Sequence, residues 1–427
     1  MHVQHNFTFT CALLFCILRA TAVLSQATRA NVSTFIYPTD YGNLTFALSA
    51  TTTGNVYMHL LAPAVYQWVG TGIGSEMDGS VMFILYESAD KGSVTLSTRL
   101  STGRVEPTFS SDVDCALQNN TAYNNSIIQM GGTRFYSASI HCKNISAFGE
   151  SDGKLDLTNA KQPFLYAWGP TDGSISSASK SASIKRHAAY GNFWMDMTKA
   201  ASSNLEDVTI PSDASLLSIQ NAGADGQAER DGDKVGPAHA AIMLAAFVII
   251  FPLGAILLRF LESVKAHYIV QTIGVLAAIV GVGVGIYLST MYNRSKDISS
   301  GHQVFGLVLL ALLFAQWAIG FYHHLCFRKY KRSTVFGKVH LFAGPAVVLG
   351  GIINGFTGFN FSGEPHNNVY YGAAVAVVFV IVLALLGWKR WSSKKTEGDR
   401  ISSDEELHCD SYQMNGGPRS TYQVFVS

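Results

Sequence analysis

The chain has 427 residues, of which 48% are hydrophobic, and its formal net charge is +1 at pH 7. This apolar content is too high for an ordinary soluble protein, and the balance of charge gives no basic excess for binding nucleic acid. The composition therefore favours a membrane protein and argues against nucleic acid as a partner.

The N-terminus has the features of a secretory signal. An apolar run from Phe7 to Leu18 is followed by small residues near Ser25. This pattern predicts a signal peptide over residues 1–25, cut before about Gln26, although its positively charged start is poor. A signal anchor is the alternative, but the run is short for a membrane span.

Residues 26–200 consist of short alternating apolar runs separated by Gly, Asn, Asp and Ser. Runs of four to eight residues with this texture predict strands, and no helical period of useful length intervenes. We therefore expect an extracellular antiparallel β-sandwich. The predicted strands are Leu44 to Ser49, Val56 to Ala62, Val81 to Tyr86, Val94 to Leu100, Phe135 to His141, Phe164 to Trp168 and Phe193 to Met197.

Two cysteines in this region, Cys115 and Cys142, are expected to form a disulfide, because a secreted domain with two cysteines usually pairs them. Asn-x-Ser/Thr sequons predict a glycoprotein, and all of them fall on the extracellular side of the topology derived below. They begin at Asn31, Asn43, Asn119, Asn124, Asn144, Asn293 and Asn360.

Two stretches of the predicted sandwich are candidates for chemistry. The first, Trp68 to Gly79, contains four glycines and Met77, and the second, Ile184 to Met197, contains His187 before an aromatic strand. The glycines alone suggest a phosphate loop, but no helical pattern follows them. Taken singly, Met77 is more often a core residue and His187 more often a surface residue.

Together the two stretches resemble the haem-binding cytochrome domain of fungal cellobiose dehydrogenases, a member of the DOMON group of β-sandwiches. The resemblance covers residues 68–78, 166–172 and 183–200, and it implies a b-type haem whose iron is held by Met77 and His187. The flavin portion of those dehydrogenases is missing, because no strand, Gly-rich turn and helix follow residue 200. Sugar oxidation by this chain is therefore not expected.

Residues 201–235 are rich in Ser, Asp, Gly and Ala and have little periodicity. This composition predicts a flexible linker with a reach of about 30 to 35 Å. Such a reach would let the sandwich dock on the membrane half and leave it again. A passive spacer is the alternative.

Five apolar stretches lie within residues 236–391, each near the ~20 residues that cross a bilayer. They predict an all-α membrane bundle of five transmembrane helices. The polar residues 392–427 predict a disordered cytosolic tail. The spans are Pro237 to Leu258, His267 to Leu288, His302 to Phe327, Val335 to Phe356 and Val369 to Trp388.

Four of these segments carry a histidine near one end: His239, His267, His302 and His340. Because the chain reverses direction at each crossing, His239 and His302 lie at one level of the membrane, and His267 and His340 lie at the other. In a bundle with alternate helices on the diagonal, each level holds two facing imidazoles. This is the arrangement of two stacked haems with two axial histidines each.

Glycines follow two of the histidines by one helical turn, Gly306 after His302 and Gly344 after His340. A missing side chain there lets a flat ligand approach the backbone. The alternative for any one histidine is a hydrogen bond to a neighbouring helix. For four histidines at matched depths the functional interpretation is preferred, since ionisable groups inside a membrane are usually functional.

Residues 236–358 resemble the cytochrome b561 family. The resemblance rests on His267 with Gln271 and Gly274, on His302 with Gly306, and on His340 with Gly344. It implies two b-type haems, one held by His239 and His302 and the other by His267 and His340. Ala follows His239 where the family often has Gly. His323 and His324 are interpreted as interfacial residues, with substitution as an inner ligand as the alternative.

Positive charge gives the expected orientation. Lys and Arg gather at Arg259 to Lys265, at Arg328 to Arg332 and at Lys389 to Lys395, all on one side of the five-span topology. The opposite loops carry only Arg294 and Lys296. The positive-inside rule predicts an integral protein of the plasma membrane or another secretory membrane, with its N-terminal domain extracellular or lumenal and its C-terminus cytosolic.

The expected function is electron transfer by an oxidoreductase with three b-type haems per chain and no further catalytic residues. Met/His ligation raises a haem potential, so electrons should run from a cytosolic reductant through the membrane pair to the sandwich and an extracellular acceptor. Resemblance suggests ascorbate as donor and ferric chelates or copper oxygenases as acceptors. Lys265, Arg332 and Lys338 could hold an anionic reductant, although topology alone explains them.

Two other functions stay open at this point. One is a non-redox receptor with a glycan-binding sandwich on an inert anchor. The other is a redox-active membrane half whose sandwich only binds a partner.

Overall fold

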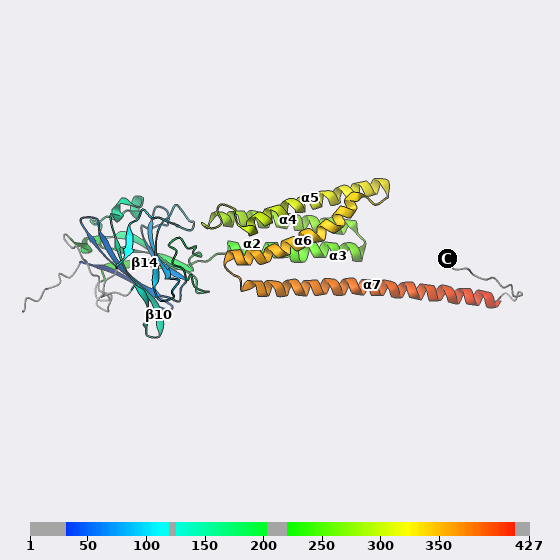
Figure 1. Cartoon of the computed structure of the whole chain (residues 1–427), viewed down its shortest axis with the longest axis horizontal. Helices are drawn as coiled ribbons and strands as arrows, with labels where there is room; N and C mark the ends of the chain where they lie inside the picture. The colour runs from blue at the N-terminus through cyan, green and yellow to red at the C-terminus, as the bar shows by residue number, and fades with distance from the viewer. Residues whose placement is uncertain (1–30, 119–124, 203–219, 415–427) are drawn as a thin grey trace, which may run out of the picture. The chain divides into compact units, whose positions relative to one another are not determined.

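The computed structural model describes residues 31–118, 125–202 and 220–414. The chain divides into two compact units, Met1–Gly232 and Asp233–Ser427, which are labelled by their elements in Figure 1. The signal peptide predicted over residues 1–25 lies outside the described residues.

The first unit is a β-sandwich of two sheets, as predicted. One sheet has the order β1-β2-β3-β10-β8, with β13 beside β2 and β9 beside β10, and the other has the order β14-β12-β11-β4-β5-β6-β7. All pairs between neighbouring strands are antiparallel except that of β13 with β2. The strands are β1 (Ser33–Thr39), β2 (Gly42–Thr51), β3 (Val56–Pro63), β4 (Trp68–Ile73), β5 (Val81–Glu87), β6 (Val94–Leu100), β7 (Thr108–Phe109), β8 (Cys115–Leu117), β9 (Ser126–Met130), β10 (Thr133–Cys142), β11 (Gln162–Trp168), β12 (Ala189–Met195), β13 (Ala201–Ser202) and β14 (Ala222–Arg230).

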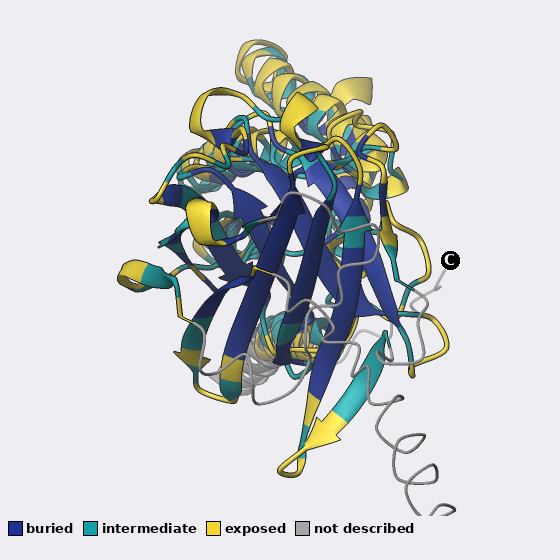
Figure 2. Ribbon diagram, turned by 90° about the vertical axis from the view of Figure 1, so that its left-hand side faces the viewer, coloured by how far each residue is buried: buried dark blue, intermediate teal, exposed yellow. Residues whose placement is uncertain are grey.

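Alternation along the strands gives the second sheet an inner and an outer face. On β5, Val81, Phe83 and Leu85 belong to the core between the sheets, while Met82 and Ile84 belong to a separate cluster on the outer face. Figure 2 shows the strands dark blue, and therefore buried, along most of their length, with the connecting loops largely exposed. Both faces of this sheet are thus covered at β5.

The disulfide prediction is confirmed, since Cys115 is bonded to Cys142 and the two residues face each other in register on β8 and β10. The seven predicted strands correspond to seven of the observed ones. Strand β4 occupies the Gly-rich stretch, whose glycines lowered its apparent strand propensity, although its six residues are all buried.

The predicted linker over residues 201–235 is corrected by the structure. Residues Ala222–Arg230 form strand β14, which pairs with β12 at the edge of the second sheet. The strand escaped prediction because its residues are mostly polar and it has no buried face. The backbone N–H of Asp231 also donates to the Ala188 carbonyl. Only residues 232–234 then separate the sandwich from the first helix, and three residues span about 10 Å at most.

The second unit contains the predicted helices. Within the described residues, five helical segments are long and apolar enough to cross a membrane: Val235–Leu261, Val264–Thr290, Gly301–Tyr330, Val335–Ser362 and Asn367–Ser392. The elements are α2 (Val235–Leu244), η5 (Ala245–Ile250), α3 (Phe251–Leu261), α4 (Val264–Thr290), α5 (Gly301–Tyr330), α6 (Val335–Ser362) and α7 (Asn367–Met414).

The first span contains a π-helical segment, η5, between α2 and α3. Pro252 is the second residue of α3 and has no N–H to donate to the carbonyl four residues earlier. A π turn adds one residue to the helix at such a point. Every later residue of this span therefore takes the position on the helix surface that the residue before it would have in a regular helix.

The predicted disorder from Ser392 onward is corrected for residues 392–414, because α7 continues to Met414. The sequence contains no proline between Asn367 and Met414 that would end the helix. The polar composition of this segment led to the prediction of disorder. A helix that continues from an apolar span is already nucleated, so it can extend through polar residues without an apolar face to pack.

Candidate functional site

The four membrane histidines meet in two pairs. The ring centroids of His239 and His302 are 6.2 Å apart, and those of His267 and His340 are also 6.2 Å apart. In both pairs the ring planes stand at 89° to each other. These are the two pairs that the alternating topology predicts.

Each histidine is oriented by a backbone carbonyl of the neighbouring antiparallel helix. Every Nδ1 lies within hydrogen-bond distance of such a carbonyl oxygen, which can accept its proton and leave Nε2 with its lone pair free for a metal. The contacts are His239 with Gly281 at 2.7 Å, His267 with Gly254 at 2.8 Å, His302 with Asn354 at 3.1 Å and His340 with Gln316 at 3.1 Å. At His340 the side-chain Nε2 of Gln316 also lies 2.9 Å from Nδ1.

The two pairs lie at different depths. His302 and Gln316 are both on α5, and the Gln316 carbonyl contacts His340 of the other pair. Fourteen residues of α-helix rise about 21 Å, so the two levels are separated by most of a hydrocarbon core of about 30 Å.

The geometry of each pair fits one haem iron. Two imidazoles that bind a single metal at about 2.0 Å have ring centres roughly 6.2 Å apart. The measured separations agree with this value, and neutral imidazole with its Nδ1 proton held by an acceptor is the form that binds haem iron. His239, His302, His267 and His340 therefore have the chemistry and the spacing to hold two haems.

Three glycines that the sequence analysis overlooked lie directly against these rings. A Cβ on Gly285 would be 2.8 Å from Cε1 of His239, one on Gly320 would be 2.5 Å from Cε1 of His340, and one on Gly358 would be 2.8 Å from Cε1 of His302. Each follows a histidine of its own helix by 18 residues. That repeated spacing was the signal that could have found them.

Of the three glycines that the sequence analysis named, Gly274 faces the ring of Phe251, and Gly306 and Gly344 face buried amide side chains. A Cβ on Gly306 would lie 3.0 Å from Nδ2 of Asn354, and one on Gly344 would lie 2.8 Å from Nε2 of Gln316. No other heavy atom comes within 3.4 Å of either position among the described residues. Asn354 and Gln316 therefore occupy the space beside Gly306 and Gly344, so these glycines allow close helix packing and do not provide the open surface expected for a flat ligand.

The basic end of the bundle contains the residues considered for reductant binding and as alternative haem ligands. Lys265, Arg332 and Lys338 are all exposed there, and Lys265 and Lys338 each precede a paired histidine by two residues. His323 does not join a pair: its Nδ1 lies 2.7 Å from the Thr334 hydroxyl, and its ring packs on Gly337. His324 is half-buried on the same turn of α5.

In the sandwich, Met77 packs against the outer-face cluster of the second sheet. This cluster consists of Trp68, Met82, Ile84, Tyr86, Ala167 and Ile184. Met77 lies in the turn between β4 and β5, where Ser80 N–H donates to its carbonyl at 3.2 Å. Its half-buried thioether is thus held at the apolar face of β4 and β5.

Residues 175–187, here called the strap, cross the same outer face and end at His187. Alternate side chains of β6 hold the strap's backbone: the Thr95 hydroxyl donates to the Ser177 carbonyl at 2.8 Å, and the Ser97 hydroxyl donates to the Lys180 carbonyl at 2.5 Å. Buried Arg99 donates to the Ala182 carbonyl at 2.5 Å. The strap is therefore fixed at two-residue intervals along β6.

A buried ion pair completes this anchor. Arg99 Nη1 lies 3.3 Å from Oε1 of Glu106, and the same oxygen accepts the Ile184 N–H at 2.9 Å. Both side chains are almost completely buried. The indole N–H of Trp68 then donates to the Lys185 carbonyl at 3.0 Å, which positions the residues just before His187.

His187 is 15% exposed, and its Nδ1 lies 3.2 Å from Oδ2 of Asp231, off the direction of a hydrogen bond. Burial lowers the pKa of His187, and the Asp231 carboxylate partly offsets this. Arg186 holds the same carboxylate at 2.7 Å. His187 is consequently neutral near pH 7, which is the form that binds iron.

His187 and Met77 approach the outer face from opposite ends of β4. Ala189, two residues after His187, pairs with Trp168, whose other neighbour is Val69 near the start of β4, while Met77 follows the end of β4. A thioether and a neutral imidazole beside an apolar face are a suitable donor set for a Met/His haem.

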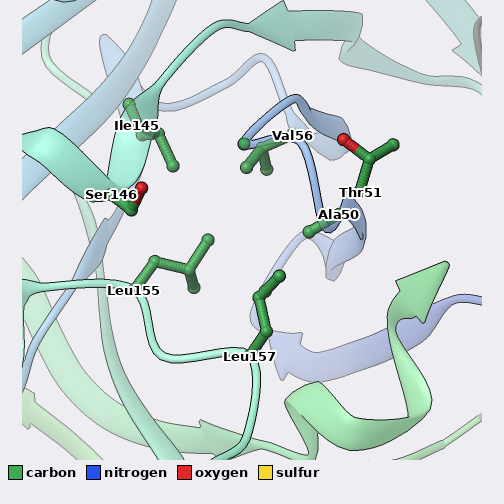
Figure 3. Close-up of a pocket in the computed structure, with 8 residues that line it drawn as sticks. Ala50, Thr51, Val56, Ile145, Ser146, Leu155 and Leu157 are labelled. Atoms are coloured by element: carbon green, nitrogen blue, oxygen red, sulfur yellow. The ribbon is translucent and has the colours of Figure 1, made fainter. Parts of the chain in front are cut away.

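A pocket elsewhere in the sandwich is too small for such a ligand. It is lined by Ala50, Thr51, Val56, Ile145, Leu155 and Leu157 among others (Figure 3), and its volume of about 20 Å³ is near that of one water molecule.

The comparisons with known proteins agree with this division. Residues 27–207 match the family described as the cytochrome domain of cellobiose dehydrogenase, and residues 225–326 match a family described as a domain of unknown function, DUF2427. The N-terminal unit is therefore similar to cytochrome domains of this type. A search of curated proteins gives no match.

Solved structures similar to the chain include two cytochrome domains. The cytochrome b domain of pyranose dehydrogenase from Coprinopsis cinerea is 14% identical, with 39% of this chain and 84% of that chain covered and a TM-score of 0.32. The cytochrome domain of Myriococcum thermophilum cellobiose dehydrogenase is 16% identical, with 47% and 77% covered and a TM-score of 0.23.

Proposed function

We propose that the chain carries electrons across a membrane, from a cytosolic reductant to an extracellular acceptor, with one haem in the sandwich and two in the helical unit. The observation that carries the proposal is the pair of matched histidine sites, each 6.2 Å between ring centroids, about 21 Å apart in depth. The cytochrome-type sandwich supports it, because cytochrome domains transfer electrons.

Haem, when bound, supplies reversible one-electron redox chemistry. His267 and His340 would hold it near the basic face, His239 and His302 near the opposite face, and Met77 and His187 in the sandwich. The Nδ1 contacts keep the imidazoles in the ligating tautomer, and the strap keeps His187 at the outer face of the sheet.

The proposed direction follows from charge and ligand type. The basic loops favour a cytosolic location for the His267 and His340 level. Met/His ligation raises a haem potential relative to bis-histidine, so electrons run toward the sandwich. An electron leaving a negative cytosol also gains about 2.3 kcal/mol per 100 mV.

The donor and acceptor belong to the same proposal. Exposed Lys265 and Lys338, beside the cytosolic histidine pair, suit an anionic reductant such as ascorbate. The acceptor is a ferric chelate or an extracellular redox enzyme. A glycan-binding receptor on a membrane anchor is the competing function, and it needs no paired histidines.

The ratio of haem to protein, together with dithionite-reduced spectra of the purified full chain, tests the proposal. We expect three haems per chain. Two haems would leave only the membrane half as a redox unit, and none would refute electron transfer by this chain.

A histidine variant sharpens the assignment. His187→Ala should reduce the ratio from three to two while the membrane pair stays reducible. His141→Ala, on β10 of the other sheet, is the matched control and should keep three. An unchanged ratio in His187→Ala would refute that residue as the sandwich ligand.

A further inference from the structure

The two helix hairpins of the membrane unit share one spacing between histidines and the carbonyls that contact them. In each hairpin, α2–α4 and α5–α6, the histidine of one helix contacts the carbonyl that lies 14 residues after the histidine of the other helix. His267 is the one departure, because its acceptor Gly254 lies 15 residues after His239.

The π turn accounts for that departure. It lies between His239 and Gly254 and adds one residue to the helix. Without it, the equivalent position would be Leu253, which is 44% exposed on the outside of the bundle. With it, buried Gly254 faces α4 and its carbonyl reaches His267. The π turn thus restores the register of the first hairpin.

A second regularity involves the residue one turn after each histidine. In all four cases it packs against the very residue whose carbonyl accepts the histidine's Nδ1 proton, and one member of each contact is a glycine. The contacts are Met243 with Gly281, Gln271 with Gly254, Gly306 with Asn354, and Gly344 with Gln316.

The hairpins differ in which member is the glycine. In α2–α4 the large side chain follows the histidine and the acceptor is glycine, whereas in α5–α6 the glycine follows the histidine and the acceptor is large. All four acceptors are buried. The space between helices is filled in both hairpins, by side chains from opposite helices.

From this exchange we infer that Met243 and Gly281 are positioning residues for His239, and that the large and small members can trade places without loss of the site. The inference rests on the proposed function, because His239 is positioned toward a haem shared with His302. The carbonyl of residue 281 contacts the His239 ring only if α2 and α4 are close enough. That closeness requires one large side chain and one glycine at positions 243 and 281.

Single and double exchanges test this. In Gly281→Met the new Cβ would lie 2.5 Å from the Met243 sulfur, and the rest of the new side chain would compete with Met243 for the same gap. Two large side chains there push α2 and α4 apart, and the carbonyl of residue 281 leaves His239. We expect the single variant to fall from two membrane haems to one. The double variant Met243→Gly/Gly281→Met should recover both, because it adopts the pattern of the second hairpin.

The readouts are haem per chain and the electron paramagnetic resonance spectrum of the full chain, which is sensitive to the angle between axial imidazole planes. The signal of the His239/His302 site should disappear in Gly281→Met together with its haem and return in the double variant, while the His267/His340 signal stays constant. Loss of both signals together would indicate general misfolding of the bundle and would overturn a role specific to His239.

The inference is also overturned if Gly281→Met keeps both signals unchanged, or if the double variant recovers neither haem nor signal. Met243→Gly alone should keep the haem but alter its signal, since the ring gains room. Failure of the proposed function has a different outcome, because the unmodified chain would then contain no membrane haem to perturb.

Discussion

The sandwich and the helical unit fix their histidines by different means. In the sandwich, polar side chains from β6 hold a strap that ends at His187, and a buried ion pair completes the anchor. In the helical unit, backbone carbonyls contact the histidine rings, and glycines leave the space that the rings occupy between helices. A carbonyl within a helix still has a second lone pair after its helical bond, so it can accept an imidazole N–H.

This difference follows from the two environments. Helices in a membrane gain little from apolar burial against each other, so close contact through small residues and interhelical hydrogen bonds carries their association. A sandwich in water is stabilised by burial of a large apolar core, and this stability tolerates a polar network on its other face. The helical sites should therefore be sensitive to single methyl groups, and the sandwich site to loss of charge.

The largest expected effect is at the helical glycines. Gly358→Ala places a methyl group against His302 and should remove one membrane haem, and Gly320→Ala should do the same at His340. Gly283→Ala is the control, since no described atom lies within 4 Å of its Cβ position. Pyridine haemochrome analysis measures the ratio. Full haem content in Gly358→Ala would show that the ring does not depend on this contact.

The next effect concerns the ion pair under the strap. Arg99→Leu leaves Glu106 buried without its partner, which costs about 3–5 kcal/mol of unfolding free energy. Denaturation of the full chain in detergent, followed by β-sheet circular dichroism, measures it. Exposed Arg104→Leu should be near neutral. Equal stability of the two variants would contradict the anchoring role of the pair.

Removal of the disulfide should cost slightly less. The bond between Cys115 and Cys142 spans a sequence separation of 27 residues, and closing such a loop is worth ~3–4 kcal/mol. The double variant Cys115→Ser/Cys142→Ser should lower the sandwich's denaturation midpoint accordingly. Cys326→Ser, at the free cysteine of α5, should leave that midpoint unchanged.

The smallest effect is a pH dependence confined to the sandwich. Burial lowers the pKa of His59 to about 4, from 6.5 in an unfolded chain. Below pH 6.5 the unfolded state takes up a proton that the folded state refuses, so stability falls as pH falls to about 4, by about 3 kcal/mol. Denaturation midpoints from pH 7 to 4 measure this. His59→Gln should fall less steeply, and an equal slope would assign the dependence to other groups.

Much of the architecture could be predicted from local pattern. Apolar runs predicted the five spans, because a segment that crosses a bilayer has few structures available to it. Reversal of the chain at each crossing predicted the pairs of His239 with His302 and of His267 with His340. Period-two alternation located the strands with buried faces. Strand β14 could not be found this way, because an edge strand exposed on its surface keeps polar residues and is defined by its partner β12.

The sequence by itself determined the spans, the disulfide and the depth of each histidine, since these depend on hydrophobic length and on the order of the residues. Only the tertiary structure decided which carbonyl lies against each Nδ1, which glycines lie against the rings of His239, His302 and His340, and why Gly254 follows His239 by one residue more than the other spacings. Those features depend on how neighbouring helices are rotated, and a π turn of six residues changes that rotation without an obvious signature in composition.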